Sequence, residues 1–136
     1  MIERVHEHII SELGANTRTD TIFVLTAIFL NLLTLGINSG IASGTGGDAT
    51  TTIIMFTFVA LLIVVNLIAE VGLIRGRQTR AKLLSGLLKM YKDQGVEAYY
   101  DPSLLGDYRT RYNLFMLAVL ITGLVALIVP FILLAT

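Results

Sequence analysis

Cysteine and tryptophan are absent from the 136-residue sequence, and only 15% of its residues are charged. Without cysteine, the chain can form no disulfide and offers no thiolate as a nucleophile or metal ligand. A soluble domain normally carries about 25% charged residues. The low charge, together with 54% hydrophobic residues, therefore indicates a surface that faces lipid. We expect one all-α integral membrane domain over residues 1–136.

Residues that commonly act in catalysis or metal binding are equally sparse. The sequence contains two histidines, His6 and His8. His8 and Glu12 lie one helical turn apart, but two such residues on an exposed helix are a weak metal signal. The sequence contains no nucleophile–base set, no P-loop, no HExxH motif and no haem or flavin pattern. We expect no metal site, no cofactor and no enzyme activity.

Three apolar segments are candidates to cross a bilayer, which takes about 20 residues for a hydrocarbon layer of about 30 Å. They are residues 21–37, 52–74 and 113–136. The first has 17 residues and is near the short limit. The first two are joined by a Gly/Thr-rich segment at 38–51, which we expect to be an outer loop with Asp48 as the N-cap of the second span. The sequence thus predicts three transmembrane helices.

The N-terminal segment at residues 1–20 is predicted to be a separate amphipathic helix. It is too charged to cross a membrane, so we expect it to lie on the membrane surface or under a neighbouring subunit. The polar run at residues 17–21 indicates a break, with Asp20 as the N-cap of the first span. The apolar side of this helix would consist of residues at helical spacing, namely Ile2, Val5, Ile9, Ile10 and Leu13.

The long polar segment at residues 75–112 is predicted to form a cytoplasmic helical hairpin. Gly95 is the expected C-terminal cap of its first arm, and Pro102 marks the start of its second. The apolar stripe of the first arm offers a surface for a cytoplasmic protein partner; it comprises Leu83, Leu84, Leu87, Leu88 and Tyr91.

The ten Lys and Arg residues all fall on one side of this topology, before the first span or between the second and third. The positive-inside rule therefore predicts a plasma-membrane protein with a cytoplasmic N-terminus and hairpin and an external C-terminus. Four acidic residues share the hairpin segment, so contact with lipid headgroups accounts for the basic groups. We expect the lipid bilayer, and no nucleic acid, as a partner.

Each span carries a polar side chain near its middle. At about 1.5 Å per residue, Asn31 lies about 16 Å from Asp20, and Asn66 lies about 14 Å from Arg75. The first span presents one polar stripe, and the third span contributes Thr122. Glu70 lies one turn from Asn66 and about 8 Å from Arg75, and a carboxyl group in a span marks a function or a specific partner.

Two interpretations of these groups remain open. They either bond the helices to one another or line a water-filled path in a homo-oligomer. Small residues at four-residue spacing favour close helix packing and are Gly72, Gly76, Ala118, Thr122 and Ala126. Three helices enclose little interior, so we expect a homo-oligomer under either interpretation.

The leading functional expectation is a small homo-oligomeric cation channel lined by the first or second span. Its pore-lining or ion-binding candidates are Asn31, Thr34, Asn38, Asn66 and Glu70. The alternative is a structural or accessory membrane subunit whose hairpin docks a cytoplasmic partner and whose polar residues only hold the helices together.

Overall fold

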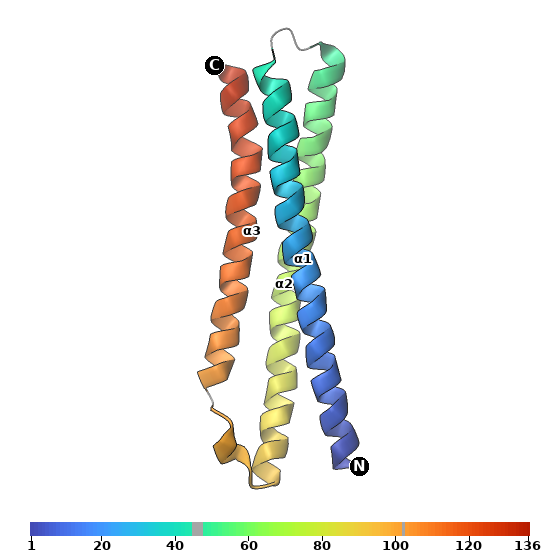
Figure 1. The fold of residues 1–136 in the computed structure, drawn as a ribbon, viewed down its shortest axis with the longest axis vertical. Helices are drawn as coiled ribbons and strands as arrows, with labels where there is room; N and C mark the ends of the chain where they lie inside the picture. Colours follow the sequence, from blue (N-terminus) through green and yellow to red (C-terminus); the bar gives the residue numbers. More distant parts are fainter. Residues whose placement is uncertain (45–47, 102) are drawn as a thin grey trace.

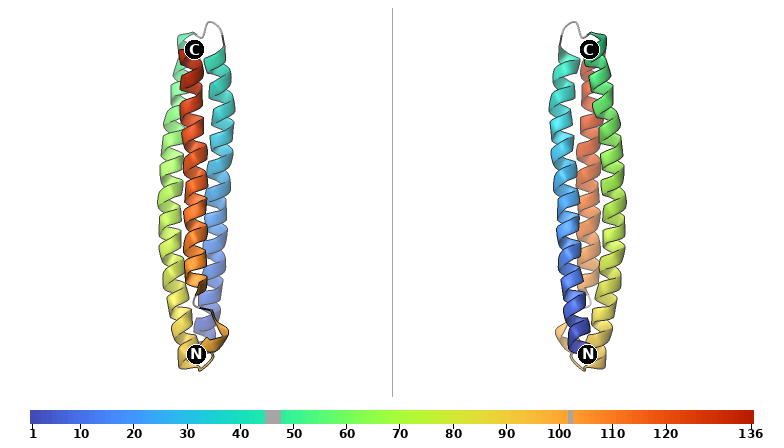
Figure 2. Two further views of the ribbon diagram at one scale, coloured as in Figure 1. Left: turned by 90° about the vertical axis from the view of Figure 1, so that its left-hand side faces the viewer. Right: turned by 90° about the vertical axis from the view of Figure 1, so that its right-hand side faces the viewer.

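The computed structural model describes residues 1–44, 48–101 and 103–136. The described chain forms three long α-helices, α1 (Ile2–Ser43), α2 (Ala49–Asp93) and α3 (Ser103–Ala135), and a 3-10 turn, η1 (Glu97–Tyr99). The long helices pack side by side as an antiparallel bundle (Figures 1 and 2). The C-terminus lies at the same end as the α1–α2 connection, and the N-terminus lies at the opposite end (Figure 1).

All three helices are long and apolar enough to cross a membrane, which confirms the predicted all-helical fold with three helices that could span a bilayer. With 42 and 45 residues, α1 and α2 measure about 63 and 68 Å. That length is about twice the thickness of the hydrocarbon layer. The bundle therefore continues beyond the apolar segments into a polar end, which we define as residues 2–20, 75–93 and 103–112.

The predicted break at residues 17–21 is wrong, because α1 runs without interruption from Ile2 to Ser43. The hydroxyls of Thr17 and Thr21 donate to the carbonyls of Leu13 and Thr17, at 3.1 and 2.8 Å. Asp20 caps no helix and instead lies inside the bundle, 4% exposed. The N-terminal segment is therefore the first arm of the polar end and continues directly into the first span.

The loop between α1 and α2 is shorter than the predicted residues 38–51, because α1 continues to Ser43 and α2 begins at Ala49. Asn38 stays helical because its side chain is buried and its Nδ2 donates to the Met55 carbonyl at 3.3 Å. Residues 45–47 lie outside the described residues. Asp48 caps α2 as predicted, with Oδ1 accepting from the Thr51 amide at 2.9 Å, and this bond lowers the pKa of the Asp48 carboxyl.

The connection between α2 and α3 turns where the sequence indicated. Gly95 adopts a left-handed φ of 72°. The amides of Gly95 and Val96 donate to the carbonyls of Lys92 and Tyr91, at 3.1 and 2.9 Å, which is a Schellman cap. Asp101 Oδ1 accepts from the Ser103 amide at the start of α3, at 3.0 Å, while Pro102 lies outside the described residues.

The two arms of the predicted hairpin are the ends of α2 and α3, and both pack with α1 along the bundle. Leu84 and Leu87, on the leucine stripe, are each 3% exposed. This stripe therefore faces the bundle interior, because α1 is long enough to cover it. The hairpin is continuous with the spans and is not a separate unit standing beside them.

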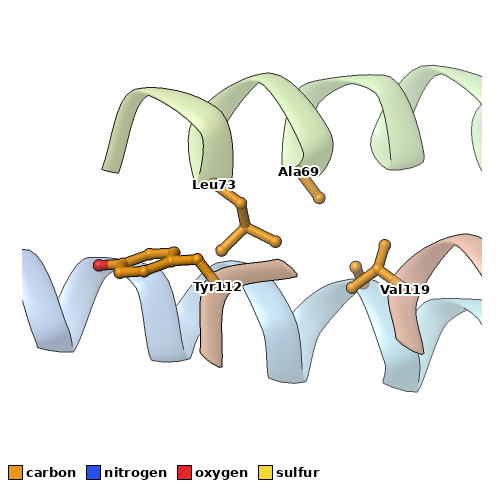
Figure 3. Close-up of a cluster of buried hydrophobic side chains, with 5 residues drawn as sticks. Ala69, Leu73, Tyr112 and Val119 are labelled. Atoms are coloured by element: carbon orange, nitrogen blue, oxygen red, sulfur yellow. The ribbon is translucent and has the colours of Figure 1, made fainter. Parts of the chain in front are cut away.

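The interior of the bundle follows a heptad-like pattern with spacings of three, four and seven residues, which is typical of helices that supercoil around one another. On α1 the buried positions are Asp20, Ala27, Asn31, Thr34, Asn38 and Ala42. Leu73 and Ala69 of α2 point toward Tyr112 and Val119 of α3 in the central apolar cluster (Figure 3). The α1 seam is polar, so its side chains need partners on the other two helices.

Candidate functional site

Asn31, Asn66 and Thr122 meet at the middle of the bundle and join all three helices. Asn31 Nδ2 donates to Asn66 Oδ1 at 3.0 Å, to Thr122 Oγ1 at 2.9 Å and to the Val119 carbonyl at 3.3 Å. In return, Asn66 Nδ2 donates to Asn31 Oδ1 at 2.7 Å. These three side chains, which we call the mid-span cluster, satisfy one another within a single copy of the chain.

The mid-span cluster fixes the rotation and height of each helix relative to the others. An amide NH2 has two N–H groups, so the three acceptors around Asn31 Nδ2 share them. Hydrogen bonds between membrane helices contribute on average about 0.6 kcal/mol each. Because Asn31 has no exposed surface, the cluster bonds the helices together and leaves no part of the Asn31 side chain at the surface of the bundle.

Gly123 is part of this arrangement, although the sequence analysis did not select it. A Cβ built at Gly123 would lie 2.7 Å from Asn66 Oδ1, which is too short for a carbon–oxygen contact. Only glycine therefore lets the Asn66 amide pass α3 on its way to Asn31. The neighbouring Thr122 belongs to the predicted small-residue row, but nothing in that row indicated which position must lack a side chain.

The rest of the polar stripe of α1 also faces inward. Thr34 is 2% exposed and Asn38 is fully buried. Asn38 Oδ1 has no hydrogen-bond partner in the described part of the chain. Three of the five predicted pore-lining residues, Asn31, Thr34 and Asn38, therefore lie in the interior of one bundle, away from any surface that a second copy could reach.

Glu70 makes no hydrogen bond to the mid-span cluster in the described chain and lies beside Asn66 in a groove between α2 and α3. The groove has a volume of about 230 Å³ and is apolar apart from Glu70 and Asn66; its lining is Leu62, Ile63, Asn66, Leu67, Glu70, Leu120, Gly123, Leu124 and Leu127. Glu70 Oε1 is buried, and no residue in the described ranges donates a hydrogen bond to it. We call this feature the α2–α3 groove; it brings Glu70 and Asn66 together, as the sequence predicted from their spacing.

The Gly72 and Gly76 pair packs α2 against α1 of the same copy. A Cβ on Gly72 would lie 2.8 Å from Phe23 Cε2, and a Cβ on Gly76 would overlap the Asp20 carboxylate. The Gly76 carbonyl also accepts from Asn16 Nδ2 at 3.3 Å. On α3, Ala126 is fully buried and Ala118 is half-buried. These small residues therefore serve close approach inside the bundle.

A second polar network crosses the bundle where the polar end begins. Arg80, only 7% exposed, donates through Nε to Asn16 Oδ1 at 3.1 Å and through Nη2 to the Leu13 carbonyl at 3.0 Å and to the Thr17 hydroxyl. It is bonded to α1 at three points, and its guanidinium carbon also lies 4.7 Å from the centre of the Tyr108 ring.

Tyr112 completes this network from α3. Its hydroxyl shares a single O–H between Asn16 Oδ1, at 2.9 Å, and the Asp20 carboxylate. Asn16, Arg80 and Tyr112 were not predicted to form a group. The available signal was the spacing of Asn16 and Asp20, which continues the polar seam of α1 toward the N-terminus.

Metal binding finds no support in the described residues, where no three His, Cys, Asp or Glu side chains lie close enough to share an ion. His6 Nε2 instead lies 3.1 Å from the Tyr91 hydroxyl. Its ring packs on Tyr91 with 5.8 Å between centroids. This histidine therefore contributes to packing between α1 and α2.

Comparison with protein-family models, with curated proteins and with solved structures found no match to this chain. What the protein does is therefore inferred from its own residues, chiefly the two polar networks and the α2–α3 groove.

Proposed function

We propose that this protein is a structural or accessory membrane subunit that works by assembly, binding a helix from a second copy of itself in the α2–α3 groove. One observation carries the proposal: Glu70 lies in an apolar groove with a buried oxygen that no described residue satisfies. A carboxyl group at membrane depth is costly unless it is hydrogen-bonded or hydrated. Glu70 therefore requires a partner from outside its own bundle.

Asn66, the nearest polar neighbour, cannot supply the missing donor. Its Nδ2 donates to Asn31 Oδ1 and to the Leu62 carbonyl, each at 2.7 Å. Both N–H groups of the amide are thus in use. The remaining residues of the groove carry no polar side chain, so a hydrogen-bond donor has to enter from a second molecule.

The outer face of α1 in a second copy has a donor at the required depth. Gly76 lies against Asp20, so this contact sets a common level for α2 and α1. Glu70 lies six residues from Gly76 along α2. Thr26 lies six residues from Asp20 along α1. Both are therefore about 9 Å deeper in the membrane than the level of the Asp20–Gly76 contact. Thr26 is exposed, so two copies inserted in the same direction can bring its hydroxyl to Glu70.

Such a contact joins two different surfaces, the α1 face of one copy and the α2–α3 groove of the next. Contacts of this kind close into rings when the rotation between subunits permits. The outer face of α1 is also strongly apolar, with Leu25 and Phe29 64% and 66% exposed. Both surfaces are therefore suited to helix packing within a bilayer.

Cysteine cross-linking tests this assembly. No cross-link can form through a native cysteine, because the sequence contains none. The outer face of α1 and the α2–α3 groove carry Phe29 and Leu67 at the same depth, nine residues from the Asp20–Gly76 level. We therefore expect Phe29→Cys in one tagged copy to cross-link to Leu67→Cys in another. The matched control is Ile53→Cys, which is similarly exposed on α2 but lies about 35 Å from that level. We expect at least a tenfold difference in yield on blots of cross-linked membranes.

Glu70 substitutions then test the hydrogen bond itself. Glu70→Gln keeps an acceptor and should retain the cross-link, whereas Glu70→Leu should lose most of it. Equal yields from the Leu67 and Ile53 positions, or full yield in Glu70→Leu, would contradict the proposed assembly.

A cation channel is the second candidate, favoured by the presence of both Asn66 and Glu70 in the α2–α3 groove. In this function water, and not a helix, would solvate Glu70. The path would depend on these two residues alone, since Asn31, Thr34 and Asn38 are enclosed. Cation flux in liposomes that is lost in Glu70→Gln would favour the channel over the accessory subunit.

The proposed orientation places the polar end in the cytoplasm and the C-terminus outside. All ten Lys and Arg residues belong to the polar end, and the positive-inside rule assigns such a side to the cytoplasm of the plasma membrane.

A further inference from the structure

We propose that a basic cavity between α2 and α3 at the polar end binds the phosphate headgroup of an anionic phospholipid. The cavity has a volume of about 410 Å³, enough for a headgroup phosphate and its glycerol. The lining residues on which the inference depends are Arg77, Arg80, Leu84, Leu105, Gly106 and Arg109. The inference does not depend on the proposed assembly, because it concerns a different part of the α2–α3 surface.

The charge of the basic cavity matches a phosphate. Three arginines line it, and none of its described lining residues is acidic. Arg80 is fixed by its bonds to Asn16, Leu13 and Thr17, and Arg77 is positioned by its Nη1 donating to Asn113 Oδ1 at 2.6 Å. Arg80 uses Nε and both N–H groups of Nη2 in these bonds, so it offers the cavity its charge and Nη1. Arg77 uses only Nη1, so its Nε and Nη2 can bind phosphate oxygens as a pair.

The depth of the basic cavity matches the headgroup layer. The second apolar span ends beside Arg75, and the α2 residues of the cavity extend from Arg77 to Ser85, about 3–15 Å beyond Arg75. Each headgroup layer of a bilayer is about 5–8 Å thick. A phospholipid in the adjacent leaflet therefore presents its phosphate at the inner part of the cavity.

Two features favour a lipid over a free phosphate compound as the ligand. The cavity opens at the membrane boundary, where lipid phosphates are far more concentrated than soluble ones. Leu84 and Leu105 give it an apolar wall, which suits the glycerol and upper acyl chain. Basic pockets between transmembrane helices are known sites for anionic headgroups.

Native mass spectrometry of the full-length protein in nonionic detergent tests the site. Dioctanoyl phosphatidylglycerol is expected to bind at least tenfold more tightly than dioctanoyl phosphatidylcholine. The double variant Arg77→Gln/Arg109→Gln should lose this preference. Its matched control is Arg75→Gln/Lys82→Gln, which removes the same charge from exposed residues outside the cavity and should behave like the wild type.

Gly106 gives a second test that leaves every arginine in place. A Cβ at Gly106 meets no atom within 4 Å, so Gly106→Glu and Gly106→Gln should both fold. The glutamate should lower phosphatidylglycerol binding at least tenfold by repulsion, and the glutamine should change it less than threefold. Equal binding of the two lipids, or equal effects of the two Gly106 variants, would overturn the proposal.

Glycerol phosphate, which has no acyl chains, distinguishes a phospholipid headgroup from a soluble phosphate compound as the ligand. It should compete with phosphatidylglycerol only at concentrations at least a hundredfold higher than the lipid. If it binds as tightly as the lipid, the ligand is a soluble phosphate compound and the lipid assignment is wrong.

Discussion

Replacing Asn31 with alanine is expected to destabilise the bundle by about 3–5 kcal/mol. The change removes the hydrogen bonds that link Asn31 to Asn66, Thr122 and Val119. At about 0.6 kcal/mol for each bond between membrane helices, these account for about 2 kcal/mol. The rest comes from the Asn66 amide, which loses its partner and costs about 1–3 kcal/mol when left unsatisfied.

Reversible unfolding in mixed micelles, followed by far-UV circular dichroism, measures this loss. Thr57→Ala is the control, since the exposed Thr57 hydroxyl bonds, among the residues that the structure describes, only the Ile53 carbonyl of its own helix, at 2.8 Å. We expect its effect to stay below about 0.5 kcal/mol. If Asn31→Ala costs no more than Thr57→Ala, the mid-span cluster does not hold the helices together.

Gly76→Ala is expected to have the largest effect of any single methyl group added to the chain, about 3–5 kcal/mol. The new Cβ would overlap the Asp20 carboxylate, so α1 must move away from α2 or Asp20 must leave Tyr112. Overpacking costs about 1–3 kcal/mol, and losing a buried hydrogen bond to a charged group costs a further 1.5–3 kcal/mol or so.

Gly36→Ala is the control, and we expect it to change the stability of the bundle in the opposite direction. Gly36 is exposed on α1, and a Cβ there meets no atom within 4 Å. Alanine is the better helix former by about 0.8–1 kcal/mol, so this variant should be as stable as the wild type or more stable. The same unfolding assay compares the two, and equal stabilities of Gly76→Ala and Gly36→Ala would contradict the close α1–α2 contact.

The spans and their connections could be predicted because their signals are local. Long apolar segments identify membrane helices without knowledge of the neighbours. The Asp48 cap and the left-handed Gly95 depend only on a few adjacent residues. The continuity of α1 through residues 17–21 could not be predicted in this way, because Asn16, Thr17 and Asp20 are satisfied by Arg80 and Tyr112, more than 60 residues away.

The sequence predicted how deep in the membrane the side chains of the candidate site lie, but it did not predict which way they face. Helical rise placed Asn31, Asn66 and Thr122 at one level, and the structure brings the three together. Whether they face one another or a shared path depends on the rotation of each helix, which follows from packing across the bundle. The role of Gly123 depends on the position of the Asn66 amide and has no signal of its own.

The accessibility of Thr34 tests most directly whether the polar seam of α1 is sealed inside a single bundle. Thr34→Cys introduces a side chain of similar size, and no other cysteine is present to react. The measurement is the rate of labelling by a charged, membrane-impermeant thiol reagent applied to both sides of vesicles, with the exposed Ser43→Cys as reference. We predict labelling at least a hundredfold slower at position 34 than at position 43, with full reaction after denaturation. Labelling of both positions at similar rates would show that water reaches this seam and would contradict the enclosed bundle.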